Sequence, residues 1–86
     1  MKIGEVWQYF DQGDGDFHTI VLIKNAGQYA CQQNKPDLLS DIWEYKILFI
    51  GTKLAENYSG TGKINGDYLY EEGRKIANSE RSLREN

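Results

Sequence analysis

The sequence contains a single cysteine, Cys31, so it cannot form an internal disulfide bond. Small secreted domains usually need such cross-links, and we therefore expect a protein of the reducing cytoplasm. Long apolar runs are also missing. None approaches the roughly 20 residues of a membrane-spanning helix, and Glu5 interrupts the segment where a secretory leader would have its apolar core. These absences predict a soluble protein that does not act at a membrane.

Positive charge is in short supply as well. The net charge is −3, which disfavours general binding to nucleic-acid phosphates. Residues 1–45 carry seven acidic and three basic side chains, whereas residues 46–86 carry six acidic and seven basic ones. The acidic half of the chain would favour encounter with a basic protein surface.

Aromatic residues, by contrast, are abundant, with two Trp, six Tyr and three Phe in 86 residues. A domain this small needs such bulky rings to build a core. Runs rich in β-branched and aromatic residues predict strands at residues 3–10, 17–24 and 28–33. An acidic turn at 11–16 and a tight turn at 25–27 would join them, and Pro36, within a break at 34–37, would end the third strand.

Residues 37–50 are open to two interpretations. With a period of two, Trp43, Tyr45 and Ile47 share one face of a strand. With helical spacing, Leu39, Trp43 and Ile47 form one stripe of a helix. The density of aromatic and β-branched residues favours the strand. The alternative is an α+β fold, in which a helix near 37–50 packs on a sheet of three to four strands.

The remainder of the chain is more polar. Residues 59–62 are expected to form a loop, and Asn65 and Gly66 a second hairpin turn. We expect one all-β domain at residues 1–73, a small SH3-like barrel of about five short strands. Residues 74–86 carry too few apolar side chains to dock firmly, and they are predicted to form a polar tail, helical or disordered.

The acidic turn also suggests a metal site. It carries Asp11, Asp14 and Asp16, with His18 just beyond it, and hard cations bind several carboxylate oxygens on one loop. The spacing does not match an EF-hand loop, because the twelfth position is Leu22 instead of a bidentate Glu. Asp and Gly are also the ordinary residues of turns. We therefore predict no metal site.

Catalytic motifs are incomplete. Residues 60–63 resemble the end of a phosphate-binding loop, but Ile64 stands where that motif needs a Ser or Thr hydroxyl. His18 stands in a predicted strand, and Cys31 on the next strand is expected to fill the core instead of forming a nucleophile with His18 as its base. The sequence thus predicts neither an enzyme nor a cofactor.

Aromatic and acidic residues together predict a surface that binds another protein. Strand 3–10 carries large apolar groups on both faces, so at least one aromatic cluster should be exposed. The predicted partner-binding residues are Glu5, Trp7, Tyr9, Asp41, Trp43, Glu44 and Tyr45. Such a protein would be an inhibitor or accessory protein of the phage or mobile-element type.

Residues 4–7 (GEVW), followed by a loop and residues 19–23 (TIVLI), resemble the start of the MazF/PemK-type endoribonuclease toxins, which are SH3-like barrels. The resemblance implies the same barrel topology. That family carries a catalytic Arg just before its second strand, where this chain reads DFH at residues 16–18. The resemblance therefore implies the fold and not the catalytic activity.

Two alternatives to protein binding are open. The chain could bind single-stranded nucleic acid, with Lys46, Lys53, Lys63 and the tail at 74–84 contacting phosphates. The acidic neighbours of the aromatic residues argue against this interpretation. A degenerate endoribonuclease is the weaker alternative.

Overall fold

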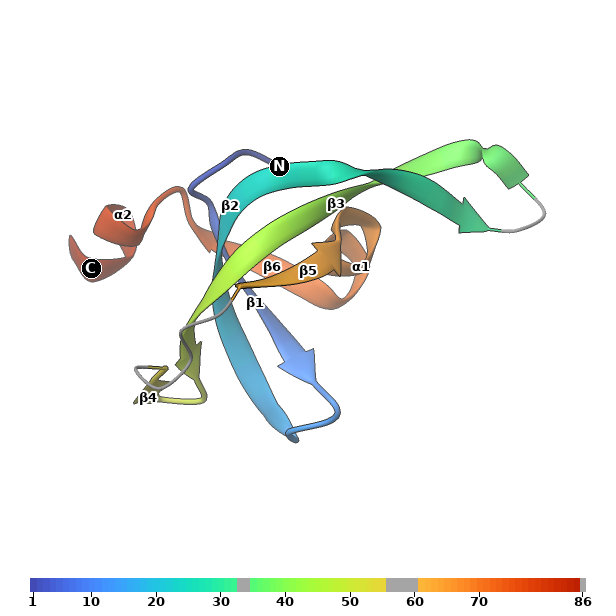
Figure 1. The fold of residues 1–86 in the computed structure, drawn as a ribbon. Helices are drawn as coiled ribbons and strands as arrows, with labels where there is room; N and C mark the ends of the chain where they lie inside the picture. The colour runs from blue at the N-terminus through green and yellow to red at the C-terminus, as the bar shows by residue number, and fades with distance from the viewer. Residues whose placement is uncertain (33–34, 56–60, 86) are drawn as a thin grey trace.

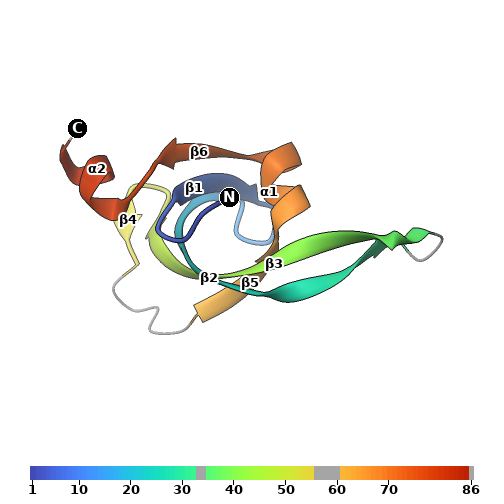
Figure 2. The same cartoon turned by 90° about the horizontal axis from the view of Figure 1, so that it is seen from above.

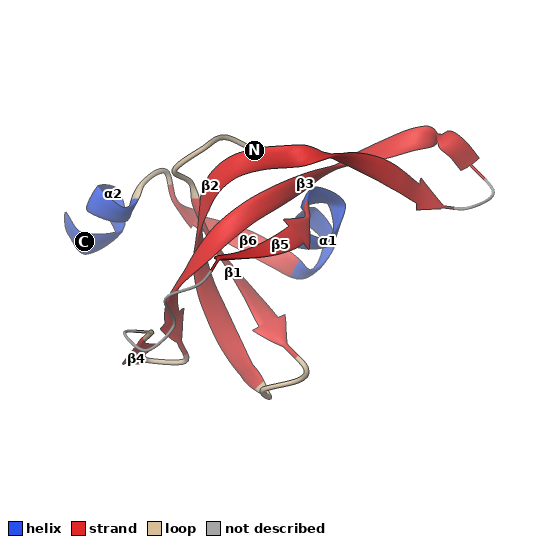
Figure 3. Ribbon diagram, viewed as in Figure 1, coloured by secondary structure: helices blue, strands red, loops and turns tan. Residues whose placement is uncertain are grey.

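Frequent aromatic and β-branched side chains place most of the chain in strands, as the sequence predicts. The computed structural model describes residues 1–32, 35–55 and 61–85. Its strands form one antiparallel sheet that curls into half a barrel, which confirms the mainly β fold class (Figure 1, Figure 3). In chain order the elements are β1 (Val6–Asp11), β2 (Asp16–Gln32), β3 (Lys35–Ile50), β4 (Lys53–Leu54), β5 (Thr61–Asn65), α1 (Gly66–Glu72), β6 (Gly73–Ala77) and α2 (Glu80–Glu85).

The strands lie side by side in the order β4-β3-β2-β1-β6, and β5 pairs with a different part of β3. Helix α1 packs against β1 and β6 at one end of the sheet and against β3 and β5 at the other (Figure 2). It therefore connects the two ends of the curl. None of the helices in the described ranges is long and apolar enough to cross a membrane.

The core fills the concave side of the sheet. Trp7 lies opposite Ile20 across the β1–β2 pair, and both belong to the buried cluster together with Tyr9 and Trp43. Leu69 of α1 is fully buried in the same cluster. Full burial of a leucine stabilises a fold by about 1.5–3 kcal/mol. The helix thus helps to hold the curl closed.

The predicted turn at 25–27 is wrong, because β2 continues through it to Gln32 (Figure 1). Gly27 has a φ of +127°, and its N–H donates to Asn25 Oδ1 at 2.9 Å. The pairing register with β3 shifts between these two residues. The local turn signal therefore produces a bulge within a long ribbon, because pairing with β3 continues on both sides of it.

Residues 37–50 form a strand, as favoured, and the helical alternative is wrong. Strand β3 pairs with β2 along most of its length and with β5 from Ile42 to Lys46. Pro36 does not end a strand but lies at the second position of β3, outside the registered residue pairs. A missing N–H is tolerated at such a position. The end of the predicted strand at 28–33 and the start of the predicted break at 34–37 lie outside the described residues.

Asn65 and Gly66 begin a helix and do not form the predicted hairpin turn. Asn65 has an extended backbone, and its Oδ1 accepts a hydrogen bond of 2.7 Å from Asp67 N, so it is the N-cap of α1. A Cβ on Gly66 would lie 3.3 Å from the Asp41 carbonyl oxygen and 3.4 Å from the Trp43 ring. A side chain at this position would therefore crowd both neighbours, and the glycine allows α1 to pack closely against β3. Residues 61 and 62 of the loop predicted at 59–62 lie in strand β5, and its first two residues lie outside the described ranges.

The prediction of a polar tail from residue 74 is wrong for its first part. Strand β6 pairs with β1, where Trp7 lies opposite Lys75 and Val6 opposite Ala77. The predicted boundary after Gly73 therefore cuts into the sheet. The helical part of the prediction is confirmed by α2, whose first turn begins after Ser79.

Candidate functional site

The two indoles and Tyr9 of the predicted binding surface lie in the core. Trp7, Tyr9 and Trp43 are each only 6% exposed, so the expectation that these rings face outward is wrong. The physical reason is the curl of the sheet, which turns their face inward, and α1, which covers it. Tyr70 and Tyr68 of α1 contact Trp7 and Tyr9 edge-on, with ring centroids 5.5 Å and 6.0 Å apart.

Glu5 is also buried, and its carboxylate bonds to a side chain of the core. Its Oε1 accepts hydrogen bonds of 3.1 Å from Trp7 Nε1 and from Lys2 N, and Lys75 Nζ lies 3.5 Å from Oε2. Burial acts to raise the pKa of Glu5, but these hydrogen bonds and the Lys75 charge outweigh it and hold that pKa below its ordinary value. The carboxylate is thus a buried anion that anchors an indole.

The other three predicted residues lie nearer the surface. Glu44 accepts a hydrogen bond of 2.9 Å from Thr61 Oγ1 and pairs with Lys24 Nζ at 3.3 Å, and these partners lower its pKa. Asp41 Oδ1 accepts a hydrogen bond of 3.2 Å from a glutamine side chain of β2. Tyr45 packs against the rim of the core. The seven predicted residues therefore do not form one exposed surface.

A different aromatic cluster is exposed on the outer face of the sheet. Phe10 and Phe17 lie opposite each other on β1 and β2, with ring centroids 5.3 Å apart, and they are 44% and 50% exposed. On β3, Phe49 lies opposite Thr19, two residues from Phe17, and on β4 Leu54 lies opposite Phe49 and is 59% exposed. The outer phenylalanine patch is defined as the exposed Phe10, Phe17 and Leu54 together with the half-buried Phe49.

Sequence reasoning missed this patch although its signal was present. With a period of two, Phe10 falls on the strand face opposite Trp7 and Tyr9. Both faces carry rings, and the tryptophans have the larger apolar surface. Because both faces carry apolar rings, this alternation indicates that one set of rings stays exposed but does not indicate which one.

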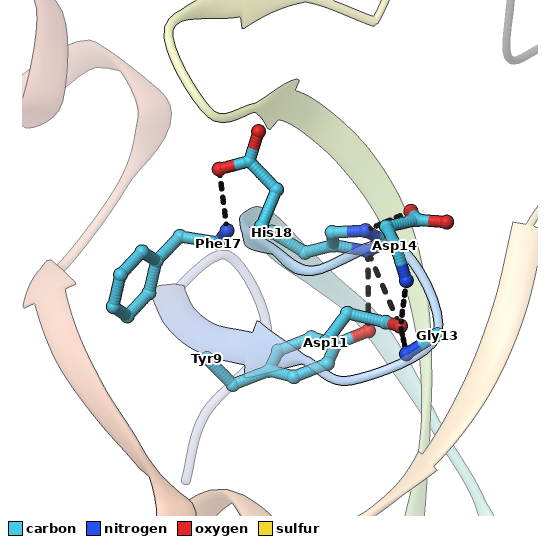
Figure 4. A network of polar contacts seen from close by, with 7 residues as sticks. Tyr9, Asp11, Gly13, Asp14, Phe17 and His18 are labelled. Carbon is cyan, nitrogen blue, oxygen red and sulfur yellow. Dashed lines mark hydrogen bonds and ion pairs between the residues drawn. The ribbon is translucent and has the colours of Figure 1, made fainter.

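The first hairpin holds a compact polar network (Figure 4). His18 Nε2 lies 2.6 Å from Asp14 Oδ2, and His18 Nδ1 lies 3.8 Å from Asp11 Oδ2. The Tyr9 hydroxyl is 3.5 Å from His18 Nδ1. Burial, followed by a hydrogen bond with Tyr45, raises the pKa of Tyr9 well above its ordinary value. His18 is buried, and its ring faces two carboxylates.

The basic side chains proposed for nucleic-acid binding are spread over the fold. Lys46, Lys53 and Lys63 are exposed on β3, β4 and β5, and Arg74 is exposed on β6. Lys63 lies opposite Glu44 in the β3–β5 pair. Positive charges placed in this way, next to carboxylates, attract phosphates less than a continuous basic groove would.

Comparison of the chain with protein families, with curated proteins and with solved structures found no match.

Proposed function

We propose that this chain is a non-enzymatic protein-binding module whose contact surface is the outer phenylalanine patch. The observation that supports this most directly is the exposure of Phe10 and Phe17, which lie side by side at 44% and 50%. Exposed aromatic rings that are grouped together are typical of protein contacts, whereas single exposed apolar residues are ordinary.

The surroundings of the patch favour a partner with a basic rim. The acidic turn at 11–16 directly follows Phe10 on β1 and precedes Phe17 on β2, and Asp14 and Asp16 are exposed there. A partner seated on the rings therefore also meets negative charge. We infer a protein surface with an apolar centre and lysine or arginine side chains at its edge. Binding of this chain would cover that surface of the partner and block it from other ligands. This is how an inhibitor acts, in line with the inhibitor or accessory function expected from the sequence.

The experiment places a photo-crosslinking phenylalanine analogue at Phe17 and, as the control, at Ile3. Ile3 is 68% exposed and lies beyond the other end of β1. A protein crosslinked from Phe17 and not from Ile3 is then purified. Its affinity is measured for the unmodified chain, for Phe17→Ser and for Ile3→Ser.

We expect Phe17→Ser to weaken binding by about 2 kcal/mol or more, roughly a thirtyfold loss of affinity, as for other aromatic hot spots. Ile3→Ser should bind within about twofold of the unmodified chain. Circular dichroism is used to check that both variants fold. Equal affinities of the two folded variants would refute the patch as the binding surface. Retention of RNA or DNA with a steep salt dependence, unaffected by Phe17→Ser, would instead favour the nucleic-acid alternative.

A further inference from the structure

We propose that Asp11, Asp14 and His18 bind a divalent first-row transition-metal ion such as Zn²⁺. One imidazole nitrogen and one oxygen from each carboxylate lie within 4.8 Å of one another. The donors come from the end of β1, the turn and the start of β2, so the first hairpin brings them together (Figure 4).

The imidazole is held in place by the fold and not by the turn alone. His18 lies opposite Tyr9 in the β1–β2 pair, its ring is 5.5 Å from the Tyr9 ring, and its side chain is only 7% exposed. Both ring nitrogens face carboxylate oxygens. A buried ring fixed by a neighbouring strand is a ligand with little conformational freedom left to lose on binding.

The two carboxylates are arranged so that each has an oxygen available. Asp11 Oδ1 accepts hydrogen bonds from Gly13 N at 2.8 Å and Asp14 N at 3.1 Å, which leaves Oδ2 directed toward His18. Asp14 is half exposed, and its Oδ2 contacts His18 Nε2. Asp11 and Asp14 share the same ion-pair partner, His18, so two negative charges face one imidazole. A divalent cation would neutralise both carboxylates.

The donor set indicates the class of ion. One imidazole nitrogen with two carboxylate oxygens suits Zn²⁺, Co²⁺ and similar ions, whereas Ca²⁺ prefers six to eight oxygen ligands. Ligands at about 2.0–2.2 Å from a metal lie roughly 3–3.5 Å from one another. The widest separation in the triad, up to 4.8 Å, therefore has to close by about 1 Å. The 2.6 Å contact between Asp14 Oδ2 and His18 Nε2 has to open by a few tenths of an ångström, and the exposed Asp14 on the turn can supply this movement.

The test uses the tag-free chain carrying Cys31→Ser, since a thiolate would itself bind these metals. Zn²⁺ and Ca²⁺ are titrated by calorimetry, and the ring signals of the only histidine are followed by NMR. The variants are Asp14→Asn and His18→Gln. The matched control is Asp16→Asn, which makes the same charge change in the same turn. Asp16 lies outside the triad, and its Oδ1 accepts a hydrogen bond from Phe17 N.

We expect saturable binding of one Zn²⁺ per chain, with a shift of the histidine signals. Asp14→Asn should weaken this binding about tenfold or more, and Asp16→Asn should change it by less than about twofold. Ca²⁺ should bind at least about tenfold more weakly than Zn²⁺. If His18→Gln fails to fold, the exposed Asp14 variant still decides the question. The proposal is overturned by unsaturable Zn²⁺ binding, by equal losses in the Asp14 and Asp16 variants, or by Ca²⁺ binding as tight as that of Zn²⁺.

Discussion

Replacing Glu5 by alanine tests whether this carboxylate anchors the core. In the structure Glu5 Oε1 accepts hydrogen bonds from Trp7 Nε1 and from Lys2 N, and Oε2 lies 3.5 Å from Lys75 Nζ. Glu5→Ala removes all three interactions. Water can solvate the exposed ammonium of Lys75, but the Trp7 N–H is left without an acceptor inside the core.

The magnitude follows from the burial of each partner. A buried donor that loses its acceptor costs about 1–3 kcal/mol, and an ion pair to an ammonium that is nearly half exposed contributes about 0–1 kcal/mol. We therefore expect Glu5→Ala to lower the free energy of unfolding by about 2–3 kcal/mol, a large fraction of the 5–15 kcal/mol typical of a domain. The melting temperature should fall by roughly 10–20 °C.

Glu5→Gln is the informative comparison, because its amide oxygen can still accept from Trp7. We expect this variant to lose about 1 kcal/mol. Glu71→Ala, an exposed substitution on α1, should stay within about 0.5 kcal/mol of the unmodified chain. Urea unfolding followed by tryptophan fluorescence measures all three. If Glu5→Ala and Glu5→Gln lost the same free energy, the hydrogen bond to Trp7 would not be the cause, and the reasoning would be refuted.

Acid should remove the advantage of Glu5 over Gln. The folded protein holds the pKa of Glu5 below its ordinary value of 4.5. The stabilisation from its charge is therefore fully present above the unfolded pKa and is lost as the pH falls through the lower folded pKa. The difference between the unmodified chain and Glu5→Gln should be largest near neutral pH and shrink at pH 3 in the same urea experiment. A difference that grew in acid would contradict the assigned direction.

Two further substitutions test how α1 is placed. Gly73→Ala would bring a Cβ to 2.9 Å from the Leu69 carbonyl oxygen and 3.0 Å from that of Gln8, both backbone atoms that cannot move aside easily. We expect a loss of about 1–3 kcal/mol by thermal unfolding, and an unchanged melting temperature would contradict this contact. Asn65→Ala removes the N-cap that accepts from Asp67 N and should cost about 1 kcal/mol, whereas Asn65→Asp, which keeps an acceptor oxygen, should recover most of it.

Local sequence predicted the elements well where one conformation was strongly favoured, and poorly at turns. The strand at 37–50 followed from its density of aromatic and β-branched residues. Asn25 with Gly27, and Asn65 with Gly66, carry similar turn signals, yet the first pair lies in a bulge and the second begins a helix. Such residues permit a sharp change of backbone direction, but they do not determine whether it becomes a hairpin turn, a bulge or the start of a helix. Pairing with the neighbouring strands determines that.

Strand β6 was missed for a related reason. Its residues 73–77 include Arg74 and Lys75 and few apolar side chains. The strand forms because β1 offers a free edge and because Lys75 meets the buried Glu5. Pairing between segments so far apart in sequence leaves no local pattern to detect.

The sequence by itself determined that strands dominate and that β1 carries rings on both faces, because side chains alternate along a strand. The length of β2 and β3, 17 and 16 residues, was not predicted. Only the tertiary structure decided which rings are inside. Curling of the sheet and coverage by Leu69 buried Trp7 and left Phe10 exposed. Hydrophobic burial is not directional, so an apolar pattern on two faces cannot choose between them. The curvature of the sheet and the position of α1 make that choice, and with it they decide which rings are left exposed.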